Sequence, residues 1–185
     1  MKHVLPPILL AALIVHLVAP SGSAKGKSTI SVGLRQHVDH SEFEEYPFDD
    51  NTLAYGAAYE YHDKHAYWQL AVLYTEDVDT VQSTTAATDS TVPLQEVDYI
   101  LTPQLNLIFK DDYWRLGGGI LSSYVVTEND EDWLDPYWQL LAGIGFPVMA
   151  FTAELNAYYV YEDLGSLFDF GFSDVELGGW LGYSF

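Results

Sequence analysis

The sequence predicts an all-β fold, a closed eight-stranded antiparallel transmembrane β-barrel that follows a cleaved signal peptide. Three observations support this prediction. Apolar and polar residues alternate along eight segments, the connections between those segments are short and long in turn, and a short apolar leader precedes them. Strands of this kind turn an apolar face outward and a polar face toward the barrel interior.

The leader occupies residues 1–24. A positively charged start precedes an apolar run from Val4 to Val18, and small residues ending in Ala24 follow it. This arrangement is typical of a secretory signal peptide cleaved after Ala24, which leaves residues 25–185 as one barrel domain. The alternative is a single transmembrane helix, but the run is shorter than the roughly 20 residues that a helix needs to span a bilayer.

Alternation at period two predicts the eight strands. They are Ser28–Val38, Thr52–Tyr61, His65–Thr75, Gln95–Ile108, Tyr113–Val126, Pro136–Phe146, Ala150–Tyr161 and Gly171–Phe185. Each is close to the roughly 9–11 residues that a tilted strand needs to cross the hydrocarbon. Short turns follow the second, fourth and sixth strands, whereas long acidic loops follow the others, at 39–51, 76–94, 127–135 and 162–170. Outer-membrane barrels have this asymmetry, with short periplasmic turns and longer external loops.

The soluble alternative is a calycin-like barrel or a sandwich, in which apolar residues line the interior. The fourth predicted strand argues against it. Gln104 and Asn106 share one face of that strand, and Leu105 and Leu107 lie on the other. A soluble barrel would have a drier interior, whereas polar side chains suit the lumen of a small membrane barrel. An even number of strands also closes the sheet, which leaves no unpaired edge in lipid.

The chain resembles the small eight-stranded outer-membrane barrels, such as the OmpX type and the membrane domain of OmpA. The resemblance rests on the leader, the strand rhythm, the loop asymmetry and the terminal Leu181-x-Tyr183-x-Phe185. That ending looks like the signal recognised by the barrel-assembly machinery. We therefore expect a monomer in the cell outer membrane, in contact with lipid and lipopolysaccharide. Members of the group include structural anchors, adhesins, narrow pores and lipid-modifying enzymes, so the architecture alone does not select a function.

The charge of the chain is strongly acidic. Removing residues 1–24 takes away one of the 7 Lys and Arg residues and none of the 27 Asp and Glu residues, which leaves 6 against 27, a net charge of −21. This excludes nucleic acid as a partner, because its phosphates require basic side chains. Divalent cations at the acidic loops are the natural counter-charges. The alternative, which we favour, is a solvated acidic surface whose aromatic residues (Phe43, Tyr46, Phe48 and Trp133) contact a partner or rest on the barrel rim.

Polar residues on the inner faces of the strands form the candidate site. By alternation these are Arg35, Glu60, Gln69, Asp98, Gln104, Asn106, Arg115, Glu154, Asp174 and Glu176. Because the last strand closes onto the first, we expect Arg35 to meet Glu176 or Asp174. Inward acids outnumber inward arginines, which predicts unpaired carboxylates or bound cations. The favoured interpretation is a plug of side chains, the normal state of an eight-stranded barrel, and the alternative is a cation-selective water path.

Catalysis by a lipid-modifying enzyme needs a serine, a histidine base and an orienting acid at the lipid-facing rim. Asp39, His40 and Ser41 are the one close trio of suitable types, but adjacent loop positions do not make side chains converge. His62 and His65 are too few for a structural zinc site. The chain has no cysteine. We therefore predict no catalytic residues, metal site or cofactor, and a non-enzymatic barrel with a structural or surface-interaction role. A small cation channel and a lipid-modifying enzyme are the alternatives.

Overall fold

The computed structural model describes residues 27–40, 43, 46–63, 65–78, 97–128, 130–163, 165–168 and 170–185. The predicted signal peptide and residues 79–94 of the predicted loop 76–94 lie outside the described residues. Among those described, no helix combines the length and apolar character needed to span a membrane.

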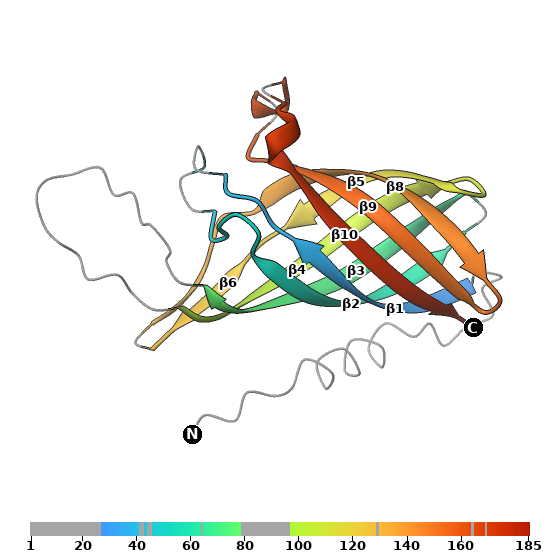
Figure 1. The fold of residues 1–185 in the computed structure, drawn as a ribbon, viewed down its shortest axis with the longest axis horizontal. Helices are drawn as coiled ribbons and strands as arrows, with labels where there is room; N and C mark the ends of the chain where they lie inside the picture. Colours follow the sequence, from blue (N-terminus) through green and yellow to red (C-terminus); the bar gives the residue numbers. More distant parts are fainter. Residues whose placement is uncertain are drawn as a thin grey trace, which may run out of the picture.

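The described chain forms one antiparallel sheet (Figure 1). Its strands are β1 (Lys27–Gln36), β2 (Leu53–His62), β3 (Ala66–Val78), β4 (Val97–Lys110), β5 (Trp114–Leu121), β6 (Tyr124–Thr127), β7 (Glu131–Trp133), β8 (Tyr137–Val148), β9 (Phe151–Tyr161) and β10 (Val175–Ser184). Two short 3-10 helices, η1 (Ser166–Phe168) and η2 (Phe172–Asp174), lie between β9 and β10. Pairing of β1 with β10 closes the sheet into a barrel.

The closed barrel has eight strands, which confirms the predicted closed eight-stranded antiparallel barrel. β5 and β6 pair in succession with β4 and form one barrel strand, while β7 pairs with β6 alone and adds a hairpin beyond the barrel. We call the end that carries the β1–β2, β3–β4, β7–β8 and β9–β10 connections the loop end. The other end carries the short turns and Phe185, and we call it the turn end (Figure 1).

The two faces of the sheet differ as the alternation predicts. On β9, Leu155 is 61% exposed on the outer face, whereas the neighbouring Glu154 is 6% exposed and points inward. On β4, Leu105 is exposed while Gln104 and Asn106 are buried. The barrel therefore has an apolar outer wall and a polar interior, the reverse of a soluble protein.

The break between β5 and β6 has a local cause in β4. Ser122 donates its backbone N–H to the carbonyl of Pro103, at 3.3 Å. Proline has no N–H to return the bond, so the ladder loses one hydrogen bond at this pair. The strand predicted as Tyr113–Val126 is therefore interrupted at residues 122–123, where Ser123 instead bonds Thr102 through its hydroxyl at 3.0 Å.

Candidate functional site

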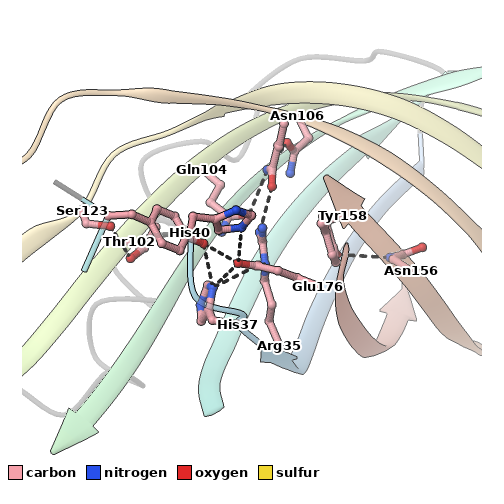
Figure 2. A network of polar contacts seen from close by, with 12 residues as sticks. Arg35, His37, His40, Thr102, Gln104, Asn106, Ser123, Asn156, Tyr158 and Glu176 are labelled. Carbon is pink, nitrogen blue, oxygen red and sulfur yellow. Dashed lines mark hydrogen bonds and ion pairs between the residues drawn. The ribbon is translucent and has the colours of Figure 1, made fainter. Parts of the chain in front are cut away.

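The inward side chains form one hydrogen-bonded chain that runs the length of the lumen. We call it the lumen chain, and its members from the loop end to the turn end are Glu176, Arg35, Gln139, Asn106, Gln69, Glu60, His62 and Lys110. These residues come from six different barrel strands, so the chain ties opposite walls of the barrel together. Figure 2 shows its loop-end half.

Arg35 and Glu176 form the charged centre of the loop end. The Nε of Arg35 donates to Oε2 of Glu176 at 2.5 Å, and both side chains are almost completely buried. Arg35 also donates from Nη1 to the side-chain oxygen of Gln139 at 2.8 Å, and its guanidinium lies 4.2 Å from the ring centre of Tyr158. A buried ion pair of this kind is costly to break, because removing one partner leaves the other charge desolvated and unpaired.

Residues of the β1–β2 connection fold into the loop end and close it. We call His37, His40, Phe43, Tyr46 and Phe48 the cap. Its polar members converge on Glu176. His37 Nδ1 lies 3.0 Å and His40 Nε2 3.6 Å from carboxylate oxygens (Figure 2). The Tyr46 hydroxyl donates to Oε1. Thus one carboxylate on β10 holds three side chains that follow β1: His37 lies within the predicted strand Ser28–Val38, and His40 and Tyr46 lie within the connection predicted as an acidic surface.

The aromatic members of the cap stack on its histidines. Phe48 lies parallel to the ring of His37 at 3.8 Å, and Phe43 lies parallel to that of His40 at 4.8 Å. Phe48 is 2% exposed and packs with Val97 and Ile100 of β4. The cap is therefore a packed plug rather than a solvated loop.

Burial sets the protonation of two cap residues. It raises the pKa of Tyr46 well above the ordinary value of 10.0, and the charge of Glu176 adds to the effect, so the hydroxyl remains a donor. Burial also lowers the pKa of His37 from its ordinary value of 6.5, although the carboxylate of Glu176 raises it in part. Neutral His37 therefore suits the closed cap.

Side-chain amides form the middle of the lumen chain. Gln139 donates to Oδ1 of Asn106 at 2.7 Å, Asn106 donates to Oε1 of Gln69 at 3.0 Å, and Gln69 donates to Oε1 of Glu60 at 3.1 Å. Each amide accepts from its neighbour on the loop-end side and donates toward the turn end. Such a row fills the barrel and satisfies buried polar groups that would otherwise destabilise it.

The turn end carries the remaining charges. Lys110 donates to Nδ1 of His62 at 2.5 Å, which leaves Nε2 of His62 as the donor to Glu60 at 2.9 Å. Beside this relay, Nε of Arg115 donates to Glu154 at 3.1 Å. These five residues border a polar cavity of about 140 Å³ whose other walls carry Lys27 and serine and threonine hydroxyls.

Two residues expected in the lumen lie elsewhere, and both expectations are wrong. Asp98 is exposed, because the register shifts between Val97 and Tyr99 and inverts the inward and outward faces at that end of β4. Asp174 belongs to η2 and precedes β10, where its carboxylate accepts hydrogen bonds from Gly171 and its neighbour Ser173. The expected excess of inward acids is correspondingly smaller.

The other residues expected in the lumen are all buried. They are joined with the help of Gln139, His62 and Lys110, which were not among the expected lumen residues. Arg35, Glu60, Gln69, Gln104, Asn106, Arg115, Glu154 and Glu176 are 7% exposed or less. Gln139 was the main omission, although it alternates with inward Tyr137 and Leu141 and period two was a sufficient signal. Among the cap residues, His37 continues the inward alternation of Arg35 within the predicted first strand. The others lie in a connection, which has no strand periodicity.

Small inward residues leave the space that this network fills. A Cβ on Gly145 would lie 2.5 Å from Nη2 of Arg115, and one on Gly119 would overlap Asn106. Gly33 and Gly56 in the same way face the ring of Trp180, whose indole donates to Tyr158 at 2.8 Å. At Gly33 and Gly119 a backbone carbonyl also lies within 2.5 Å of the added Cβ, so glycine is favoured there by close approach rather than by backbone conformation.

The structure shows where the histidines named as candidates for catalysis or metal binding lie. His40 points into the barrel toward Glu176, away from lipid, and Ser41 lies outside the described residues. His62 is engaged by Glu60 and Lys110, while His65 is exposed. Within the described part of the chain, no group of three or more His, Asp or Glu residues is placed to hold a metal ion.

Comparison with known proteins identifies the fold. No protein-family model matches the chain, and no curated protein matches it in sequence. The N-terminal β-barrel domain of Pseudomonas aeruginosa OprF superposes with a TM-score of 0.53 at 10% identity, over 87% of this chain and 100% of that one. Neisserial surface protein A (NspA) superposes with a TM-score of 0.51 at 8% identity, over 89% of this chain and 100% of that one. This chain therefore has the closed eight-stranded barrel fold of small outer-membrane proteins.

Proposed function

We propose that this protein is a non-enzymatic outer-membrane barrel whose lumen is closed by its own side chains, and which acts as a structural or surface-interaction protein. The observation that carries the proposal is the continuous lumen chain with the cap packed over its loop end. An eight-stranded barrel filled in this way leaves no open water path past Arg35 and Glu176.

The outer wall supports a place in a membrane. Leu155, Leu177 and Leu181 are each more than half exposed on neighbouring strands, an apolar surface that would be a liability in water. Leu181, Tyr183 and Phe185 lie exposed on the same wall at the turn end, in keeping with recognition of this ending by the barrel-assembly machinery. With the turn end in the periplasm, the loop end faces the cell exterior, among lipopolysaccharide.

The loop end supports a surface role. The β6–β7 hairpin extends beyond the barrel and presents four exposed acids, at Glu128, Asp130, Glu131 and Asp132, next to exposed Trp133. Divalent cations that bridge these carboxylates to lipopolysaccharide phosphates, or a basic partner, are the contacts that this chemistry favours.

Single-channel conductance in planar bilayers tests the closed lumen. Refolded residues 25–185 should give no regular current steps, while heat-modifiable gel mobility and co-flotation with vesicles show that the barrel is folded and inserted. The matched variant is Arg35→Ala/Glu176→Ala, which removes both charges of the buried pair and the carboxylate that holds the cap. We expect conductance from this variant alone.

Reproducible, cation-favouring steps from the unaltered protein would overturn the proposal and favour the small cation channel. Release of fatty acid from lipid A by the folded protein would instead favour the lipid-modifying enzyme. Silence of the unaltered protein, with folding and insertion demonstrated, supports the plug.

A further inference from the structure

Exposed aromatic residues gather in the connection between β9 and β10. Phe172 is 90% exposed and Phe170 is 50% exposed. Their ring centroids are 5.3 Å apart in an edge-to-face arrangement, so the two rings form one apolar unit. An aromatic side chain left this open to water is unfavourable unless a second surface covers it.

This aromatic unit is continuous with the outer wall of the barrel. Phe170 packs edge-to-face on Tyr159 at 5.1 Å, and Tyr159 also stacks with Tyr161, which is 7% exposed. Tyr159 pairs across the sheet with Leu140, which is itself 43% exposed. The aromatic row therefore begins on the apolar wall and leads outward from it.

Hydrogen bonds hold the connection in this position. The Tyr159 hydroxyl donates to the carbonyl of Ser166 at 2.9 Å, which fastens η1 to the wall. Asp163 accepts from the backbone N–H of Ser166, and Asp174 accepts from that of Gly171. The direction of Phe170 and Phe172 is thus set by the fold of the connection on both sides of them.

The connection also differs from its neighbours in direction. Figure 1 shows it standing off the side of the barrel at the loop end of β10, whereas β6 and the chain beyond it extend along the long axis. In a barrel that spans a membrane, a sideways element at this end lies in the plane of the bilayer rather than above it. Glu162 and Asp163 are exposed at its base and restrict it to the depth of the headgroups.

We propose that the β9–β10 connection is an interfacial anchor, in which Phe170 and Phe172 insert among the acyl chains of the outer leaflet and fix the depth of the loop end. The proposal rests on the membrane location given under Proposed function. Lipid is the occupant because ring contacts from Tyr159 through Phe170 to Phe172 continue the apolar wall. A protein partner is an outcome of the test.

The absence of cysteine makes single-site labelling direct. Phe172→Cys, Leu155→Cys and Asp132→Cys would each be labelled with the environment-sensitive fluorophore NBD and refolded into phosphatidylcholine vesicles with brominated or ordinary acyl chains. Position 155 reports the lipid-facing wall, and position 132 on β7 reports the solvent-exposed hairpin. We expect bromine to quench position 172 about as strongly as position 155, with position 132 unaffected.

A second reporter removes the effect of the label's own apolar character. Ser173→Cys carries the label beside both intact phenylalanines, and the same reporter is made with Phe170→Ser/Phe172→Ser. Quenching at 173 should be present in the first protein and lost in the second. Quenching at 155 without quenching at 172 and 173 would show an inserted barrel with no anchor, as a protein-binding loop requires. No quenching at 155 would overturn the membrane location itself.

Discussion

Gln139 and Asn106 are joined across the middle of the barrel by a 2.7 Å hydrogen bond in which the amide of Gln139 donates. The direction of this bond follows from the charges at the ends of the row. Arg35 is a donor only, so Gln139 must accept from it with its oxygen. Glu60 is an acceptor, so Gln69 must donate to it. The amides between these two charges therefore have one consistent orientation.

Replacing Gln139 should be among the most destabilising polar substitutions in the barrel. Gln139→Ala leaves Nη1 of buried Arg35 and Oδ1 of buried Asn106 without these partners. We expect a loss of about 2 to 4 kcal/mol in the free energy of unfolding. Urea titration of the protein in phospholipid vesicles, followed by tryptophan fluorescence, measures it.

Gln36→Ala is the matched control, because the Gln36 amide bonds Asn51 at an exposed position. This substitution should change the free energy of unfolding by no more than about 0.5 kcal/mol. Equal losses from the two substitutions would contradict a structural role for the lumen chain.

The cap should loosen in acid. Burial lowers the pKa of His37, so as pH falls through 6.5 the unfolded chain takes up a proton that the folded protein resists. Stability then falls with falling pH, by at most about 1.4 kcal/mol per pH unit for one proton. The groups facing His37 are Glu176, Arg35, His40 and Tyr46, and a second positive charge beside Arg35 is unfavourable.

The quantity to measure is the urea midpoint of unfolding, compared between pH 7.5 and pH 5. His37→Gln should reduce this difference, because the altered side chain does not titrate. His65→Gln, an exposed histidine at the β2–β3 turn, should leave it unchanged. A pH dependence that is the same in both variants and in the unaltered protein would rule out His37 as its source.

The period-two alternation of the strands explains which parts of the site can be predicted from the sequence and which cannot. Closure of the last strand onto the first brings Arg35 to Glu176, a contact that alternation and topology predict together. One extra residue in β4 inverts the face of Asp98, and nothing in the local sequence marks that shift. Beyond His37 the cap follows no period, so the burial of Phe48 depends on a tertiary cavity that becomes evident only in the folded barrel.

Inward glycines should be far less tolerant of a methyl group than outward ones. A Cβ on Gly119 would overlap the carbonyl of Leu105 and the side chain of Asn106, and a backbone carbonyl cannot move aside. A Cβ on Gly179 would meet Leu155 at 3.6 Å, an ordinary contact. We expect Gly119→Ala to cost about 3 kcal/mol or to prevent folding, and Gly179→Ala to change stability by less than about 1 kcal/mol. Refolding yield and urea midpoints would test the difference, and similar outcomes for both would contradict this packing.

The turn between β8 and β9 contains a residue whose replacement should stabilise the protein. Val148 pairs with Phe151, so Met149 and Ala150 form a two-residue hairpin turn. Met149 has φ 60 and is 100% exposed, which places a side chain with no packing role in a conformation that favours glycine. Met149→Gly should therefore raise the free energy of unfolding by about 0.5 to 1 kcal/mol. Met149→Ala keeps the Cβ and should give no such gain in the same urea titration. An equal gain from alanine would place the effect in the loss of an exposed apolar side chain rather than in the backbone.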